Sequence, residues 1–144
     1  MARIRIDCPE HFTFQCRIPV RINDINYGGH VGNDSILSLV HEARMQFLIH
    51  HGYTEMAIGG LGLIMADAGI EFKSELFYGE TVTVSVAAGE MTRIGFDIYY
   101  KLEKQAGEKT ITVAIAKTGM IFYNYPEKKI AAVPEEVRQK LSGS

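Results

Sequence analysis

The residues best suited to chemistry lie in one short segment of this 144-residue chain, "DINYGGHVGNDS", residues 24–35. It leads directly into a long apolar stretch with helical spacing. The N–H groups at the start of a helix lack partners within the helix, and the helix dipole favours negative charge there, so such a start suits an oxyanion developing on a carbonyl group. Gly28, Gly29 and Gly32 would let a ligand approach the backbone closely. Alternatively, the glycines serve only a turn that needs positive φ, and the polar residues only cap the helix.

Three side chains could take a proton from a water molecule near such a site: His30, Glu42 and Asp67. His30 changes charge near neutral pH, although it could instead anchor the loop through a backbone hydrogen bond. Glu42 falls beside Leu39 at the edge of the predicted helix's apolar side, where half-burial would favour proton transfer; it could equally be a surface acid. Asp67 stands in a mostly apolar strand, "LIMADAGI", and such an acid usually faces water or a partner chain.

The elements that must position these residues follow from the hydrophobic pattern. Residues 12–22 alternate and predict a half-buried strand, in which Pro19 indicates an edge or a bulge. Residues 34–53 have helical spacing, with Asn33, Asp34 or Ser35 available to cap the start and Gly52 placed to end the helix. The side chains expected on the inner side of the strand are Phe12, Phe14, Cys16, Ile18, Val20 and Ile22. Those expected on the apolar arc of the helix are Ile36, Leu37, Leu39, Val40, Ala43, Phe47 and Leu48.

The second half of the chain alternates in four further segments, residues 60–73, 80–91, 94–104 and 109–125. A short helix is predicted for the tail, residues 133–141, which opens with a proline and two acids. The order is strand, long helix, then four strands, so we expect an α+β fold with a single domain over residues 1–144. The wide apolar arc indicates a curved antiparallel sheet wrapped around one long central helix. Open sheet edges would then favour pairing with a second copy.

Composition excludes several classes of protein. The formal net charge is −2 at pH 7, so no global field attracts nucleic acid or an anionic membrane. No run of about 18 apolar residues could span a bilayer, and the N-terminus does not read as a secretion signal, so a cytoplasmic location is expected. Cys8 and Cys16 do not form a disulfide framework or a metal motif, and both are expected to be reduced, with Cys16 in the core.

No metal site is expected. "HEARM", residues 41–45, has the first histidine and the acid of the zinc-protease motif but lacks its second histidine. His50 and His51 are adjacent, which should point them apart on a helix. Arg44 falls inside the apolar stripe of the same helix, which a salt bridge across a subunit contact would explain; a snorkelling side chain is the alternative.

The whole pattern resembles the hotdog-fold thioesterases, in particular the 4-hydroxybenzoyl-CoA thioesterase and acyl-CoA or acyl-ACP thioesterase group. The similarity rests on the loop "DINYGGHVGN", on "HEAR" in the long helix, and on "IEFKSELFYGETVTV". The segments "IGFDIYYKL" and "MIFYNYPEKKIAAVPEEVRQKL" fit the same pattern, so the resemblance covers nearly the whole chain. It implies a hotdog fold.

The family loop typically reads Asp-x-Asp-x-x-x-His-Val-x-Asn. Asp24 matches the first acid, His30 begins the His-Val pair, and Asn33 matches the final amide. The second acid, which family members use as nucleophile or base, falls on Asn26, and an amide cannot take a proton near neutral pH or form an anhydride. The asparagine of the acyl-ACP branch falls on Gly28. Asn26 is therefore expected to position polar groups, and Asp24 to organise the loop.

The resemblance implies an acyl-CoA or acyl-ACP thioesterase, acting as a homodimer or homotetramer, with coenzyme A as part of the substrate and no other cofactor. The expected catalytic set is Asn26, Gly29, His30 and Glu42, and the groups expected to hold coenzyme A are Lys73, Thr92 and Arg93. Two alternatives remain. Because of Asn26, the protein could bind an acyl thioester or another small hydrophobic ligand without hydrolysing it. A hotdog hydratase or dehydratase fits less well, since "GGHVGN" differs from a His-Phe-Pro loop.

Overall fold

The computed structural model describes residues 3–142 as one sheet, two α-helices and a 3₁₀ turn. The predicted domain, residues 1–144, thus extends at each end into two residues outside the described part. The elements in chain order are β1 (Phe14–Pro19), η1 (Ile22–Asp24), α1 (Asn33–His50), β2 (Gly62–Phe72), β3 (Thr81–Met91), β4 (Gly95–Ala106), β5 (Lys109–Asn124), β6 (Lys129–Ile130) and α2 (Glu135–Leu141).

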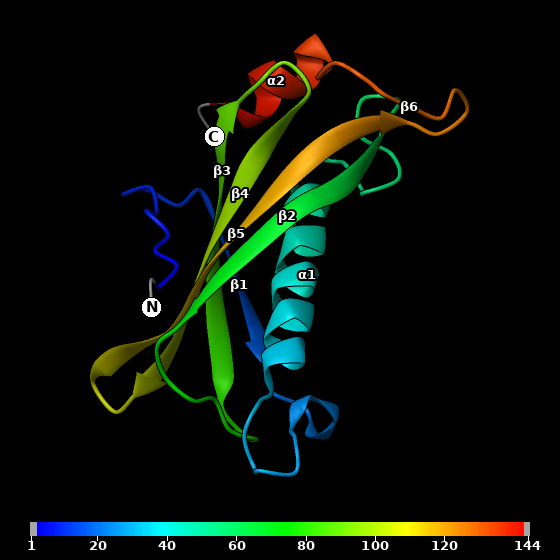
Figure 1. The fold of residues 1–144 in the computed structure, drawn as a ribbon. Coiled ribbons are helices and arrows are strands. Elements are labelled where there is room, and N and C mark those ends of the chain that lie inside the picture. The colour runs from blue at the N-terminus through cyan, green and yellow to red at the C-terminus, as the bar shows by residue number, and fades with distance from the viewer. Residues whose placement is uncertain (1–2, 143–144) are drawn as a thin grey trace.

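The sheet is antiparallel throughout, in the order β1-β3-β4-β5-β2, with β6 added to β5. It curves along its length, and α1 lies along its concave side (Figure 1). The long helix and the inward residues of the strands form one core. Its largest fully buried side chains include Phe47, Leu48, Ile98, Tyr100, Leu102 and Phe122. The predicted α+β architecture, a curved sheet around one long helix, is therefore confirmed.

The strand β1 lies at one edge of the sheet, as Pro19 indicated, and its side chains alternate between buried and exposed, as predicted. Cys16, Ile18 and Val20 are buried, and the strand ends at Pro19, which tolerates an edge because it has no N–H to donate. The prediction fails at its last residue: the chain turns into η1 after Val20, and Ile22 is 69% exposed. In α1 the predicted stripe is buried except for Leu37, which is 44% exposed because the stripe is narrower than expected at this turn.

Arg44 is paired within the chain, so the subunit salt bridge expected for it is not needed. Its Nε donates to Glu55 Oε2 at 2.9 Å, and its Nη1 donates to the hydroxyl of Tyr100 at 3.3 Å. Tyr100 shares a 2.7 Å hydrogen bond with Thr118, and His41 Nε2 lies 2.7 Å from Glu55 Oε1. The arginine is only 6% exposed, so this network satisfies a charge inside the core.

Both cysteines are free, as predicted, and Cys16 lies in the core. Burial, together with the charge of Glu42, raises the pKa of the Cys16 thiol to about 11. His50 and His51 do not point apart, since their ring centroids are 5.1 Å from each other. They nevertheless form no metal cluster, because no group of three or more His, Cys, Asp or Glu side chains in residues 3–142 could hold a metal ion.

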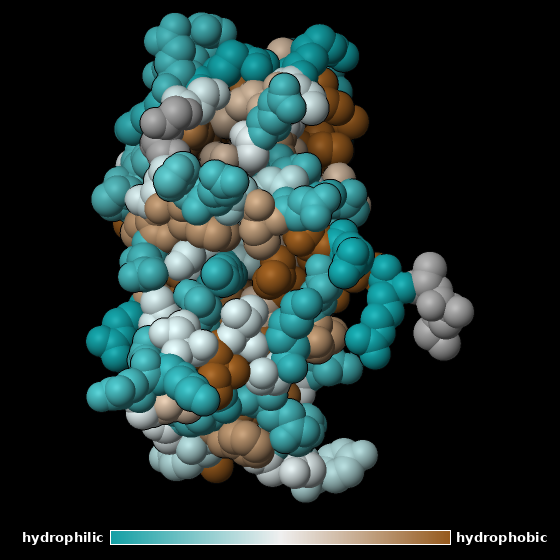
Figure 2. Space-filling view, turned by 90° about the vertical axis from the view of Figure 1, so that its left-hand side faces the viewer, coloured by the Kyte–Doolittle hydropathy of each residue, from teal (hydrophilic) through white to brown (hydrophobic). Residues whose placement is uncertain are grey.

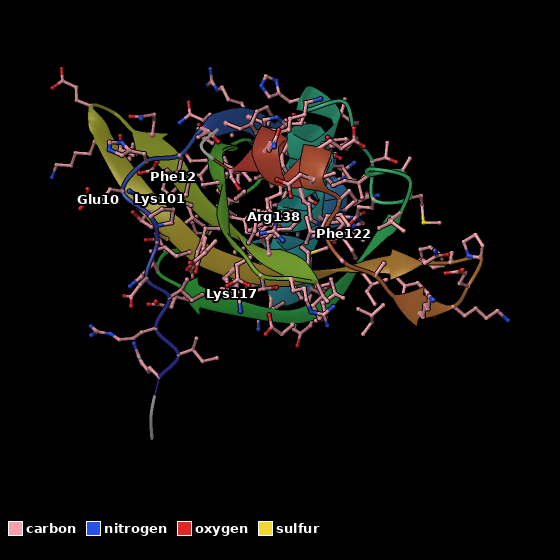
Figure 3. The ribbon with its side chains drawn as sticks, turned by 90° about the horizontal axis from the view of Figure 1, so that it is seen from above. Glu10, Phe12, Lys101, Lys117, Phe122 and Arg138 are labelled. Atoms are coloured by element: carbon pink, nitrogen blue, oxygen red, sulfur yellow. The ribbon has the colours of Figure 1, made fainter. Side chains whose placement is uncertain are left out.

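The two ends of the molecule carry different loops (Figure 1). The turn before α1 and the loop between β2 and β3 meet at one end, where the Val31 N–H donates to the carbonyl oxygen of Leu76 at 2.8 Å. At the other end α2 lies over the sheet, and Arg138 Nη2 donates to the carbonyl oxygen of Thr92 at 2.8 Å (Figure 3). Any site that uses the start of α1 therefore lies at the first end.

The surface is mixed in character. Hydrophilic side chains cover most of the face shown in Figure 2, and hydrophobic groups are exposed between them across its middle. Among residues 3–142, no helix is long and apolar enough to cross a membrane.

Candidate active site

The turn before α1 is held together by Asn26. Its Oδ1 accepts the N–H of Gly28 at 2.9 Å, and its carbonyl oxygen accepts the N–H of Gly29 at 3.1 Å. Its own N–H donates to the carbonyl oxygen of His30 at 2.9 Å. Gly29 has a φ of +87°, which a residue with a side chain rarely adopts. The amides of Gly28 and Gly29 thus already have acceptors, so the structure does not favour Gly29 as a donor to a ligand.

The amides at the start of α1 are different. Gly32 is the N-cap residue, in extended conformation, and the predicted caps Asn33, Asp34 and Ser35 are wrong because no side chain caps this helix. Within the described residues, the N–H groups of Gly32, Asn33, Asp34 and Ser35 have no hydrogen-bond acceptor. Four donors at the positive end of an 18-residue helix are therefore free to bind a negative or polarised oxygen.

A cavity of about 260 Å³ opens beside this helix start. Its lining combines apolar side chains with polar and charged ones, which come from the two loops, the helix and β2. The lining residues are His30, Val31, Asn33, Ile36, Phe72, Lys73, Ser74, Glu75 and Leu76. The structure thus brings together two of the predicted site residues, His30 and Lys73, which are far apart in the sequence.

His30 is oriented by the backbone. Its Nδ1 lies 3.1 Å from the carbonyl oxygen of Val31, an acceptor, so Nδ1 carries a hydrogen and donates it. The Nε2 atom is then left to accept or donate a proton. A half-buried imidazole fixed in this way is suited to acid–base chemistry in the cavity.

Lys73 is partly neutralised by a neighbour. Its Nζ lies 3.1 Å from Glu71 Oε2. The N–H of Ile6 and the ammonium of Lys73 both bind the Glu71 carboxylate and hold the pKa of Glu71 below its ordinary value. The cation remains exposed at the cavity, where an anionic group on a ligand could approach it.

Glu42 lies elsewhere. It is exposed on α1, accepts a 2.7 Å hydrogen bond from Gln46 and lines a different groove, of about 390 Å³, between β1 and the helix. Of the two alternatives for Glu42, a half-buried base or a surface acid, the structure shows the surface acid. Asp24 lies in the wall of the same groove and is 4% exposed. Its Oδ2 accepts the Arg21 N–H at 2.8 Å, so it organises the loop as expected.

Asp67 faces away from the helix start. It sits at an irregularity in the pairing of β2 with β5, where its Oδ1 accepts the Gly119 N–H at 3.0 Å and lies 3.0 Å from Lys117 Nζ. Figure 3 shows Lys117 on the side of the sheet opposite α1. A role for Asp67 in the cavity beside His30 is therefore not favoured within one chain.

Thr92 and Arg93 lie at the far end of the same chain from His30. Thr92 closes the turn between β3 and β4, where its N–H and hydroxyl both donate to the Gly95 carbonyl oxygen, at 2.8 and 3.2 Å. The Arg93 carbonyl accepts the N–H of Val133. The three residues expected to hold coenzyme A thus divide, with Lys73 at one end of the chain and Thr92 and Arg93 at the other.

Several cavity residues were not anticipated from the sequence. Phe72, Ser74, Glu75 and Leu76 belong to "FKSELFYGE", part of a segment that carries the family resemblance, but none of these four residues was assigned a role from the sequence. Their relation to His30 depends on the pairing of two loops separated by about 40 residues of sequence, which periodicity does not reveal. The local feature that could have drawn attention to this segment is the pair of opposite charges, Lys73 and Glu75, two positions apart.

Comparisons with known proteins show which family and which solved structures this chain is similar to. A family model described as the thioesterase-like superfamily matches residues 20–141. The curated protein named "Putative esterase" from Aquifex aeolicus (strain VF5) is 28% identical over 130 residues, which cover 89% of this chain and 97% of that protein. A 1,4-dihydroxy-2-naphthoyl-CoA thioesterase from Synechocystis gives a TM-score of 0.79 at 21% identity, covering 90% of this chain and 96% of that one.

The crystal structure of 4-hydroxybenzoyl CoA thioesterase from Pseudomonas sp. strain CBS-3 also gives a TM-score of 0.79, at 14% identity, covering 90% of this chain and 99% of that one. These similarities confirm the hotdog fold that the resemblance implies.

Proposed function

Because the chain belongs to the thioesterase-like superfamily, we propose that it hydrolyses an acyl thioester of coenzyme A, or of acyl carrier protein, to a carboxylate and a free thiol. The observation that carries this proposal is the set of four free amides at the start of α1, beside a cavity that contains His30. Such amides are already oriented towards the place where an oxyanion develops. One donor of this kind typically contributes about 3 kcal/mol to the stabilisation of the transition state.

The cavity suggests how the substrate lies. Its apolar wall, made by Val31, Ile36, Phe72 and Leu76, suits the acyl group, and its volume of about 260 Å³ admits an acyl group but not the carrier. The carrier must then extend outwards past Lys73, whose ammonium would attract a phosphate. The thioester carbonyl would lie at the start of α1.

His30 is the acid–base group that this arrangement supports best among the three predicted from the sequence. It lines the cavity, and its Nε2 is free once Nδ1 is bound to the Val31 carbonyl. Asn26 supplies no proton transfer. It fixes the turn that carries His30, which is consistent with the positioning role expected for it.

We also propose that the active unit is a dimer formed through β2. This strand is one edge of the sheet, and residues 65–68 at its centre are exposed. A two-fold axis would pair the two β2 strands antiparallel, so the His30 end of one protomer would lie beside the Thr92 and Arg93 end of the other. The predicted groups for coenzyme A would then meet at one site.

The test is release of free thiol from short, medium, long and aromatic acyl-CoAs, including hydroxylated aromatic acyl groups, and from acyl carrier protein substrates. We expect saturable hydrolysis of at least one class. His30→Gln should lower kcat by about 10²- to 10⁴-fold, the usual range for an acid–base group. Glu42→Gln should retain activity because Glu42 lines another groove.

Saturable binding of acyl-CoAs with no thiol release above the uncatalysed rate would reject the enzyme and favour the non-hydrolytic binding protein that Asn26 also suggests. Equal activity of wild type and His30→Gln would reject His30 as the acid–base group.

A further inference from the structure

The cavity beside His30 contains one carboxylate, that of Glu75. The side chain is exposed, and within residues 3–142 its carboxylate accepts no hydrogen bond and forms no ion pair. Its neighbour in the cavity, Lys73, is bound to Glu71 instead. Glu75 therefore has a free pair of oxygens at the place where the amides of α1 are also free.

Three hydrogen bonds hold the backbone around Glu75. The N–H groups of Lys73 and Ser74 both donate to the carbonyl oxygen of Val113, at 2.8 and 3.1 Å. The Glu75 carbonyl accepts a 2.7 Å hydrogen bond from Lys104 Nζ.

Leu76, the residue after Glu75, connects this loop to the turn that carries His30. The Val31 N–H donates to the Leu76 carbonyl oxygen at 2.8 Å. Lys104 also lies 3.1 Å from Glu80 Oε2, and Glu80 Oε1 accepts the Phe77 N–H at 2.7 Å. These contacts position the Glu75 backbone relative to His30 without using its carboxylate. A carboxylate that lines the same cavity as the start of α1, and accepts no hydrogen bond there, can accept a proton from a water molecule bound in that cavity.

We propose that Glu75 is the general base of this site and supplies the carboxylate that the loop lacks at Asn26; the inference rests on the proposed thioesterase function. A water molecule attacks the thioester carbon, and its proton passes to Glu75 while the carbonyl oxygen becomes an oxyanion at the amides of α1. The carbon–sulfur bond then breaks, and the thiolate takes a proton from Nε2 of protonated His30. Glu75 returns its proton to His30 through water, which restores both groups.

The division of roles follows from what each side chain can do. His30 in its doubly protonated form keeps the Nδ1 hydrogen bond to Val31 and presents a proton at Nε2. The amides of Asn26 and Asn33 cannot accept a proton near neutral pH. The carboxylates of Glu42 and Asp67 lie in other parts of the structure, and each already accepts a hydrogen bond.

The experiment compares Glu75→Gln with Glu108→Gln, an exposed glutamate in the turn between β4 and β5, using the best substrate of the acyl-CoA panel. Glu75→Gln should lower kcat by about 10²- to 10⁴-fold, whereas Glu108→Gln should not change it.

A second variant separates chemistry from folding. Glu75→Ala should regain a measurable part of the rate when formate is added, since formate can enter as a small carboxylate base, and Glu108→Ala should not respond. Wild-type hydrolysis together with a full rate in Glu75→Gln would overturn the role of Glu75 and leave the thioesterase function standing. A Glu75→Ala variant that folds but does not respond to formate would also count against it. Failure of the wild type itself to hydrolyse any thioester would instead reject the proposed function.

Discussion

Asn26 illustrates how one atom changes what a loop can contribute. Its Oδ1 accepts the Gly28 N–H as a carboxylate oxygen could, so the turn keeps its shape. The amide nitrogen, however, cannot take up a proton, which shifts proton transfer to other side chains in the cavity. His30 and Glu75 are the two that its geometry offers.

His30 could be singled out from the sequence because a histidine in a glycine-rich turn is visible locally, whereas Lys73 was expected near coenzyme A only because of the family resemblance. Glu75 was missed, since nothing near that residue in the chain indicates which loop it faces. For Arg44 a subunit salt bridge and a snorkelling side chain both stayed open, because its partners Glu55 and Tyr100 come from distant elements. Pairing of side chains across elements depends on tertiary packing, which hydrophobic periodicity does not encode.

The ion pair of Arg44 and Glu55 predicts how stability depends on pH. Burial alone would raise the pKa of Glu55, but hydrogen bonds from His41 and Arg44 outweigh it and hold the pKa below the ordinary value of 4.5. A lowered pKa in the folded state stabilises the protein above the pKa of the unfolded chain. We therefore expect the free energy of unfolding, measured with urea, to decrease as the pH falls through the range below 4.5 in which Glu55 is protonated.

Glu55→Gln tests this assignment. It leaves the buried guanidinium of Arg44 without a charged partner and should lower stability at pH 7 by about 3 kcal/mol. Its further loss of stability in acid should be smaller than that of the wild type, while Glu108→Gln should behave as the wild type. An unchanged acid dependence in Glu55→Gln would show that other carboxylates cause it.

At the scale of elements, the way in which α1 begins matters more for the proposed function than the length of the helix. The sequence places three residues that commonly cap helices at this start, yet the N-cap residue is Gly32 and no side chain bonds to the first turn. A capping side chain would occupy an amide that a ligand could use. The absence of a cap within the described residues is therefore consistent with a binding role for these amides.

The positions of the long strands and of the long helix along the chain were predictable because their hydrophobic periods are clear over ten or more residues, whereas the order of the strands within the sheet was not predicted. The errors lie where an element is short or ends. Ile22 continues the alternation of β1, but the backbone has already turned into η1. The two-residue strand β6 exists only through its pairing with Tyr123 and Asn124 of β5, and so short a segment carries no pattern of its own.

At the scale of the whole molecule, the open edge of β2 is the feature on which the proposed dimer rests. Exposed strand edges readily pair with other chains unless they are covered or charged. Residues 65–68 of this edge carry three exposed uncharged residues and Asp67. Pairing through this edge would also bring the Thr92 and Arg93 turn of one protomer to the cavity of the other.

A double variant tests this arrangement. Ala66→Lys with Ala68→Lys places four added positive charges along the paired edges, where both alanines are exposed in the single chain. We expect the wild type to have twice the mass of one chain by light scattering and the variant to be monomeric with an unchanged circular dichroism spectrum. The monomer should also show a raised KM for acyl-CoA. As a control, Lys109→Glu changes the charge at the exposed start of β5, which pairs with Ala106 of β4 and lies outside the stretch paired with β2, and it should leave the mass unchanged. A wild type that is monomeric at all concentrations and fully active would contradict the dimer.

The proposed function depends on the free amides of residues 32–35, which should hold the carbonyl oxygen of the substrate. The backbone amide resonances of ¹⁵N-labelled protein report this binding during titration with an acyl-CoA analogue in which CH₂ replaces the thioester sulfur, so that the carbonyl is kept but cannot be hydrolysed. We expect saturable shifts at the amides of Gly32, Asn33, Asp34 and Ser35, with the Gly107 amide of the β4–β5 turn unmoved. Saturable binding of the analogue that leaves these four resonances unchanged would contradict it.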